Sequence, residues 1–284
     1  MAASGTLVST EELAAHVEDP NWVVIDCRFT LTEPEAGRAA YARSHIPGAR
    51  YAHLDEDLSS PKTAASGRHP LPDPERLAAK LGQWGVGEKT QVVVYDDSFG
   101  SIAVRLWWLL RWLGHDAVAL LDGGLPKWRK EGRALTDQLP TIVPAVFAAR
   151  PSRDMWVDTQ AVLDALDRKQ TLILDARADM RFSGDIEPID PVAGHIPGAV
   201  NLPFEDNLDM GGTFLPAEEL RELYQGLLHG RDSGHVIHMC GSGVTTCHNL
   251  LAMEIAGLRG GKLYPGSWSE WIADPARPVA TGEQ

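Results

Sequence analysis

The chain of 284 residues repeats the same series of motifs in its two halves. An apolar run ends in Asp-Cys-Arg at 26–28, and a second apolar run ends in Asp-Ala-Arg at 175–177. His-Ile-Pro-Gly-Ala occurs at 45–49 and again at 195–199. Two related halves of ordinary domain size predict two domains that share one fold.

Short apolar runs alternate with helical patterns in both halves, for example at 74–84, 100–113 and 159–167. Such alternation is typical of a parallel sheet covered by helices. We therefore predict an α/β fold of two tandem domains, each with a mostly parallel sheet flanked by helices. Prolines between 137 and 152 indicate the connection. The predicted boundaries are 1–138 for the N-terminal domain, 139–154 for the linker and 155–284 for the C-terminal domain.

The stretch Cys-Gly-Ser-Gly-Val-Thr at 240–245 follows an apolar strand pattern and precedes a helical one. Gly241 and Gly243 permit the unusual φ angles that a tight loop requires. Backbone N–H groups at a helix start favour an anion, so a thiol there ionises readily. The pattern favours a reactive thiolate at Cys240, although a small buried residue at a strand end also fits it.

The two halves differ at the position of this cysteine. The motifs at 121–128 and 264–271 match at an offset of 143 residues (264 minus 121). The same offset makes Asp97 the residue equivalent to Cys240. We therefore expect the C-terminal domain to perform chemistry and the N-terminal domain to lack it.

The composition disfavours several classes of partner. A formal net charge of −13 argues against nucleic acids and anionic membrane surfaces. No stretch approaches the roughly 18 apolar residues of a membrane span, and the first residues lack a signal-peptide pattern. Three cysteines make no disulfide framework and have no zinc-ligand spacing, which favours a cytoplasmic protein without a metal.

In this order the motifs resemble those of tandem-domain rhodanese-type sulfurtransferases over nearly the whole chain. The stretches 41–49 and 264–271 resemble the N-terminal and C-terminal signatures of that family. The loop at 240–245 resembles the form of 3-mercaptopyruvate sulfurtransferases, whereas thiosulfate sulfurtransferases tend to have basic residues after the cysteine. The resemblance implies a small anionic sulfur donor, a persulfide on Cys240 and a thiol, thioredoxin or cyanide acceptor, with no cofactor.

The resemblance also implies roles for residues outside the loop. Ser242, His69 and Asp55 would form a relay that supplies a proton to the departing enolate near pH 7. Arg181 would bind the carboxylate of the donor through its planar guanidinium. The remaining residues expected to contact the donor are those of the loop, namely Gly241, Gly243, Val244 and Thr245.

One position departs from the pattern of the family. A second carboxylate-binding arginine is expected where this chain has Asp190. Since an acid would repel a carboxylate, another cation substitutes for the arginine, or the loop folds differently, or the donor is not mercaptopyruvate. On this basis Asp190→Arg would lower the KM for a carboxylated donor about tenfold.

The sequence also bears on three other functions. A thiosulfate sulfurtransferase is disfavoured because 241–245 contains no Lys or Arg. A phosphatase of this fold needs Cys-x5-Arg, and Thr246 occupies the position of the arginine. A non-catalytic persulfide carrier stays open because of Asp190. Cys27, Cys247, His45, His195 and His238 are predicted to be structural.

Overall fold

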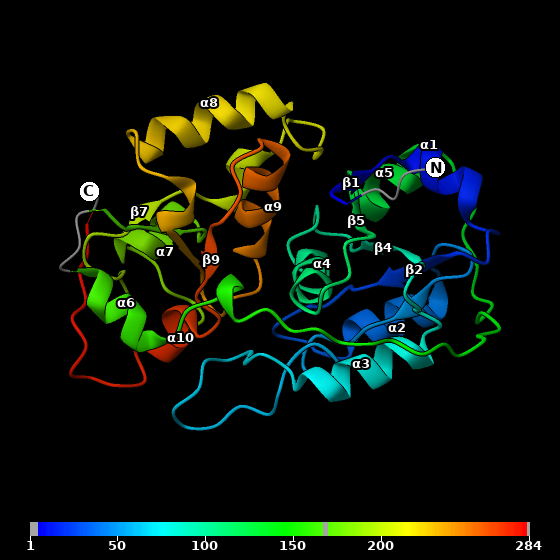
Figure 1. Cartoon of the computed structure of the whole chain (residues 1–284), viewed down its shortest axis with the longest axis horizontal. Coiled ribbons are helices and arrows are strands. Elements are labelled where there is room, and N and C mark those ends of the chain that lie inside the picture. Colours follow the sequence, from blue (N-terminus) through cyan, green and yellow to red (C-terminus); the bar gives the residue numbers. More distant parts are fainter. Residues whose placement is uncertain (1–4, 167–169, 283–284) are drawn as a thin grey trace. The chain divides into compact units, whose positions relative to one another are not determined.

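The computed structural model describes residues 5–166 and 170–282 (Figure 1). Residue 167, the last residue of one predicted helical pattern, lies outside the described residues. The chain divides into two compact units. The first unit consists of Met1–Ser60, Leu71–Ser152 and Met210–Thr213, and the second unit consists of Pro61–Pro70, Arg153–Asp209 and Phe214–Gln284.

The first unit contains a five-stranded sheet in the order β1-β5-β4-β2-β3, and its described strand pairs are parallel. The strands are β1 (Leu7–Val8), β2 (Trp22–Asp26), β3 (Arg50–Tyr51), β4 (Gln91–Tyr95) and β5 (Val118–Leu121). The helices are α1 (Thr10–His16), α2 (Ala36–Arg43), α3 (Pro74–Gln83), α4 (Ala103–Trp112) and α5 (Gly124–Lys130). The predicted parallel α/β arrangement is confirmed.

Burial on both faces explains why the strands of the first unit read as continuous apolar runs. Val93 and Tyr95 of β4 belong to a core cluster with residues of α1, α2 and α5. Since alternate side chains of a strand point to opposite faces, Val92 and Val94 face the other side, where α4 packs against β4 and β5.

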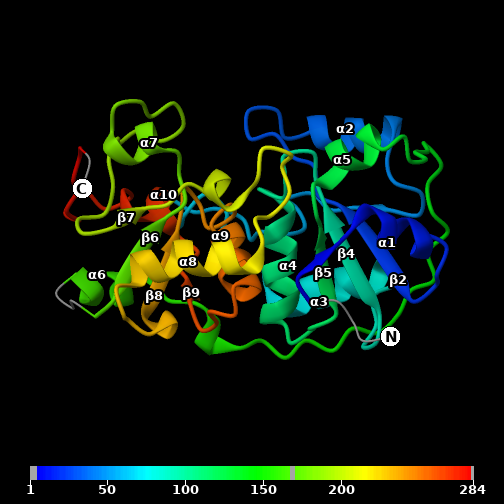
Figure 2. The same ribbon diagram turned by 90° about the horizontal axis from the view of Figure 1, so that it is seen from above.

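The second unit contains a four-stranded sheet in the order β7-β6-β8-β9, again with parallel described pairs. The strands are β6 (Leu172–Asp175), β7 (Val200–Asn201), β8 (Val236–Met239) and β9 (Lys262–Leu263). The α-helices are α6 (Thr159–Leu166), α7 (Asp179–Ser183), α8 (Ala217–Leu228), α9 (Cys247–Ile255) and α10 (Ser267–Trp271). The 3-10 helices are η1 (Arg153–Met155), η2 (Phe204–Asn207) and η3 (Ser233–His235). Figure 2 shows α8 beside α9, which packs against β8 and β9.

The repeated Asp-x-Arg motif forms the same buried ion pair in each unit. Arg28 Nη2 lies 2.6 Å from Asp26 Oδ2 and also donates to the carbonyl of Ser44. Arg177 Nη2 lies 2.7 Å from Asp175 Oδ2 and also donates to the carbonyl of Gly194. Each arginine therefore connects the end of a central strand to the residue before the His-Ile-Pro-Gly-Ala motif.

The paired histidines have structural roles in both units, as the symmetry of the motif predicts. His45 Nδ1 bonds the carbonyl of Tyr41 at 2.7 Å, and the two rings stack. His195 Nδ1 bonds the carbonyl of Phe182 at 2.8 Å, and these rings also stack. Both imidazoles are fully buried, so they hold the chain at the start of the motif.

The strand register corrects the predicted counterpart of Cys240. Asp26 pairs with Tyr95, and Asp175 pairs with Met239, so the next residues, Asp96 and Cys240, are equivalent. Their carbonyls accept matching hydrogen bonds, from Leu125 N at 2.9 Å and from Trp268 N at 3.0 Å. The offset at the loop is therefore 144 (240 minus 96), not 143, and Asp97 is not in the slot of the thiol. The first unit has one more residue between the loop and the last motif.

Asp96 shows what the loop of the first unit binds. Its Oδ1 accepts the N–H groups of Ser98 and Gly100, both at 2.8 Å. Its Oδ2 accepts those of Ile102 at 2.9 Å and Ala103 at 2.8 Å. Burial raises the pKa of Asp96, and these four hydrogen bonds oppose that effect. The first unit thus fills its own anion-binding loop with a side-chain carboxylate.

Asp96→Ala should lower the free energy of unfolding of the protein by about 2–4 kcal/mol, because it leaves four N–H donors without their acceptor. Asp97→Ala, at an exposed neighbour, is the matched control and should change it by less than about 0.5 kcal/mol. Urea unfolding measures both. Equal effects of the two substitutions would contradict the corrected register.

Candidate active site

Cys240 lies directly after β8, and the loop that follows it ends where α9 begins. The residue is 3% exposed, and its N–H donates to Ser267 Oγ at 3.1 Å. Gly243 has a φ of +72°, and a Cβ at this position would lie 2.4 Å from the carbonyl oxygen of Pro265. Glycine is therefore required for the loop to pass over Pro265.

The loop presents backbone N–H groups as its counterpart in the first unit does. The offset of 144 relates the four donors to Asp96 to the backbone N–H groups of Ser242, Val244, Thr246 and Cys247. Of these, Cys247 N donates to the carbonyl of Val244 at 3.1 Å. Within the described residues, the other three donate to no protein acceptor. The second unit therefore has N–H donors for an anion at the position of the Cys240 sulfur.

Arg177 adds a buried positive charge near this sulfur. Burial lowers the pKa of Arg177, but Asp175, Glu187 and the nearby Cys240 raise it, and the net shift is upward. The guanidinium lies 4.8 Å from the ring centre of Trp268, and its Nη1 is buried without a hydrogen bond. The sequence identified Arg177 only as part of a repeated motif, because its proximity to the thiol depends on the fold.

Ser242 and His69 form a buried hydrogen bond. The distance from Ser242 Oγ to His69 Nδ1 is 2.7 Å, and the two residues are 6% and 3% exposed. The predicted boundaries place His69 in the N-terminal domain, 1–138. In the structure His69 belongs to the second unit instead, because the segment Pro61–Pro70 packs there. The pair predicted from sequence is thus brought together within one compact unit.

Close backbone contact fixes the segment that carries His69. Arg68 N donates to Ser269 Oγ at 2.9 Å. A Cβ on Gly67 would lie 2.5 Å from the carbonyl oxygen of Gly266. Only glycine allows this approach, so Gly67 determines where the two residues after it lie.

Asp55, the third member of the predicted relay, lies in the first unit. It is exposed, and its N–H donates to His53 Nδ1 at 3.2 Å. Its part in a relay with His69 stays a prediction.

Asp190 joins two arginines. Asp190 Oδ1 lies 2.7 Å from Arg68 Nη1, and its Oδ2 lies 3.0 Å from Arg181 Nη2. Glu187 also pairs with Arg181, with 3.0 Å between Oε2 and Nε. Burial raises the pKa of Glu187, but Arg181 and two backbone N–H groups lower it, and the net shift is downward. Of the three explanations for Asp190, the contacts support the substitution of another cation, Arg68, which the sequence analysis missed.

The remaining residues of the predicted site are confined to the loop and its base. Gly241, Gly243 and Val244 are buried, and Thr245 is half-buried. Cys247 is fully buried with its Sγ 3.6 Å from the carbonyl of Gly243. The other buried polar groups predicted to be structural are equally enclosed. Burial raises the pKa of Cys27 well above its usual value and lowers that of His238 to about 3.

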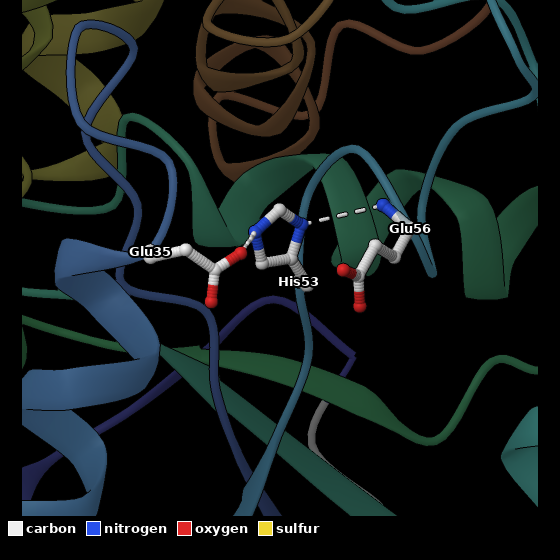
Figure 3. A group of neighbouring side chains, drawn as sticks. All are labelled: Glu35, His53 and Glu56. Carbon is white, nitrogen blue, oxygen red and sulfur yellow. Dashed lines mark hydrogen bonds and ion pairs between the residues drawn. The ribbon is translucent and has the colours of Figure 1, made fainter.

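Glu35, His53 and Glu56 in the first unit are the one group with metal-ligand spacing among the described residues (Figure 3). His53 Nδ1 accepts the N–H groups of Asp55 and Glu56, which places the ring proton on Nε2, 3.5 Å from Glu35 Oε1. Arg38 pairs with both glutamates, at 3.0 and 2.5 Å. A protonated nitrogen cannot bind a metal, so the contacts favour an ion-pair cluster.

The arrangement in the second unit suits nucleophilic chemistry on an anionic substrate. A cysteine lies among N–H donors, with a hydroxyl–imidazole pair and guanidinium groups around it. Within residues 5–166 and 170–282, no helix is long and apolar enough to cross a membrane.

Comparisons with known proteins agree with this arrangement. The rhodanese-like domain matches residues 9–131 and 158–274. A Pseudomonas aeruginosa protein named "Probable 3-mercaptopyruvate sulfurtransferase" is 49% identical over 283 residues, covering 99% of this chain and 100% of that protein. The thiosulfate sulfurtransferase of Rattus norvegicus is 35% identical over 290 residues, covering 98% of this chain and 96% of the rat protein. The crystal structure of SseA from Escherichia coli, described with the rhodanese fold and the mechanism of 3-mercaptopyruvate sulfotransferases, has a TM-score of 0.80 and 32% identity, covering 93% of this chain and 99% of SseA.

Gly67→Ala should loosen the segment Pro61–Pro70, because its new methyl group overlaps the carbonyl of Gly266. We expect amide exchange in this segment to become about 10- to 100-fold faster, as overpacking costs about 1–3 kcal/mol. Gly226→Ala in α8, where a Cβ meets nothing within 4 Å, is the control. Hydrogen exchange with mass spectrometry measures both. Unchanged exchange in Gly67→Ala would contradict the role given to Gly67.

Proposed function

This chain belongs to the rhodanese-like domain family, and we propose that it is a sulfurtransferase that takes sulfur from 3-mercaptopyruvate. The sulfur passes through a persulfide on Cys240 to a thiol, thioredoxin or cyanide acceptor. The observation that supports this most is the buried hydrogen bond, 2.7 Å long, between Ser242 Oγ of the loop that begins with Cys240 and His69 Nδ1 of the segment Pro61–Pro70. A cytoplasmic setting, favoured by the low cysteine content, belongs to the proposal.

The chemistry of the first step is a displacement at sulfur. The thiolate of Cys240 forms a bond to the donor sulfur while the carbon–sulfur bond of the donor breaks. The electron pair of that bond goes to carbon, which gives the enolate of pyruvate and leaves a persulfide, with its terminal proton, on the protein. The enolate then takes up a proton and becomes pyruvate.

Ser242 and His69 provide the proton for that enolate. A hydroxyl held at 2.7 Å from an imidazole can pass a proton and be reprotonated near neutral pH. Asp55 is proposed as the group that orients His69 in this relay. In the second step an acceptor thiolate attacks the outer sulfur of the persulfide and releases the Cys240 thiolate, so no external oxidant or cofactor is needed.

A thiosulfate donor is the second candidate. Residues 241–245 contain no cation, but the guanidinium groups of Arg68 and Arg181 lie next to Gly241, and they would also attract an inorganic dianion. The departing sulfite needs no proton, so a thiosulfate enzyme would have no use for the Ser242–His69 pair. That pair also argues against a non-catalytic persulfide carrier.

We expect kcat/KM for 3-mercaptopyruvate to exceed that for thiosulfate by about 100-fold, or about 2.7 kcal/mol. The reason is that the proton relay accelerates only the reaction that produces an enolate. Parallel steady-state assays with one thiol acceptor measure the ratio. A ratio below one would identify the chain as a thiosulfate sulfurtransferase.

Ser242→Ala should reduce kcat for 3-mercaptopyruvate by at least about 100-fold, the usual contribution of a general acid. Turnover of thiosulfate should fall much less. Ser233→Ala, which removes a half-buried hydroxyl bonded to the carbonyl of Arg259, is the control and should leave the turnover of both donors unaffected. Equal losses for the two donors in Ser242→Ala would remove the serine from proton transfer.

A further inference from the structure

Two arginines from distant segments of the chain lie next to Gly241. Arg68 belongs to the loop Pro61–Pro70, and Arg181 belongs to α7. A Cβ on Gly241 would lie 3.2 Å from Arg68 Nη2 and 3.6 Å from both Nη atoms of Arg181. Both guanidinium groups therefore reach the residue that follows the nucleophile.

A shared carboxylate holds these arginines together. Two guanidinium groups in one place repel each other unless an anion lies between them. Asp190, whose side chain is 2% exposed, gives one oxygen to each, at 2.7 Å for Arg68 and 3.0 Å for Arg181. Asp190 is thus a component of a cationic site, contrary to the repulsion expected from the sequence. With these contacts an arginine at 190 would repel Arg68 and Arg181, so Asp190→Arg would not lower the KM as the sequence suggested.

Arg68 and Arg181 have further N–H donors that are available to a second anion. Arg181 uses Nε and Nη2 for Glu187 and Asp190, and within the described residues its Nη1 donates no hydrogen bond. Arg68 Nε is buried without a partner. The two side chains remain 20% and 18% exposed, so a solute can reach them.

We propose that Arg68 and Arg181 together bind the carboxylate of the sulfur donor, with Asp190 as the positioning residue. Arg68 supplies, from a segment far away in the sequence, the cation that the family pattern would place at 190. The identity of the donor rests on the proposed function, whereas the binding of a carboxylate next to Cys240 does not.

A donor without a carboxylate separates binding from a merely structural role. Mercaptoacetone differs from 3-mercaptopyruvate by a methyl group in place of the carboxylate. In Arg68→Gln we expect KM for 3-mercaptopyruvate to rise about 10- to 100-fold with kcat changed less than about threefold. Turnover of mercaptoacetone should be unchanged. Because His69 neighbours Arg68, damage to the relay would slow both donors alike.

A matched variant controls for loss of an ion pair in the second unit. Arg259 follows the end of α9 opposite to Cys240 and pairs with Glu254 at 3.6 Å. Arg259→Gln should change neither donor. Equal effects of Arg68→Gln on the turnover of the two donors, or no effect on the turnover of 3-mercaptopyruvate, would overturn this proposal. Neither result would contradict the proposed function, which concerns the wild-type protein.

The positioning role of Asp190 has its own readout. Asp190→Asn keeps the shape of the side chain, but the amide is neutral and its single oxygen can accept from only one of the two arginines. The KM for 3-mercaptopyruvate should therefore rise about tenfold with kcat unchanged. Asp190→Glu should restore part of the affinity. A loss confined to kcat, or one shared with mercaptoacetone, would contradict the role.

Alkylation of Cys240 tests the site without any sulfur donor. Iodoacetate and iodoacetamide differ only in the charged group, and mass spectrometry locates the product. The rate of alkylation of Cys240 by iodoacetate, divided by its rate with iodoacetamide, should fall about tenfold in Arg68→Gln relative to wild type and to Arg259→Gln. An unchanged ratio would overturn the proposal. If wild-type protein turned over no 3-mercaptopyruvate, the proposed function would fail, and this ratio would still decide whether Arg68 attracts a carboxylate.

Discussion

The first unit depends on a loop of backbone N–H groups that receives an anion at the end of a central strand, and the second unit has the equivalent loop. In the first unit the anion is the carboxylate of Asp96, which accepts four N–H groups at 2.8–2.9 Å. In the second unit Cys240 stands at the equivalent position. A carboxylate is held permanently by these bonds, whereas a thiolate can react, so one residue type separates a structural loop from a candidate active site.

A series of alternating charges extends from the central strand of the second unit to the nucleophile. Asp175, Arg177, Glu187, Arg181, Asp190 and Arg68 are each within 3.5 Å of the next. Because every charge in this series has an opposite neighbour, the burial of Arg177 and the partial burial of Arg68 and Arg181 are tolerated. The same contacts fix the segment that bears His69.

Local sequence patterns made much of the fold and of the candidate site predictable. Apolar runs of four or five residues, the Asp-x-Arg motif and the glycines of the loop depend on neighbours in sequence, and they identified the parallel sheets and the loop of Cys240. The counterpart of the thiol was misplaced at Asp97, since a one-residue insertion after the loop changes the offset without any local signal. Arg68 was missed because it meets Asp190 across 122 residues, a contact that only the tertiary fold creates. Its position beside His69 was the available clue.

In the proposed reaction Cys240 carries the sulfur in transit. The most direct test is intact-protein and peptide mass spectrometry after a single exposure to 3-mercaptopyruvate without acceptor, on wild type and on Cys240→Ser. We expect one added sulfur atom, located at Cys240, one equivalent of pyruvate, and neither product from the variant. Sulfur on Cys27 or Cys247, or pyruvate formation by Cys240→Ser, would contradict it.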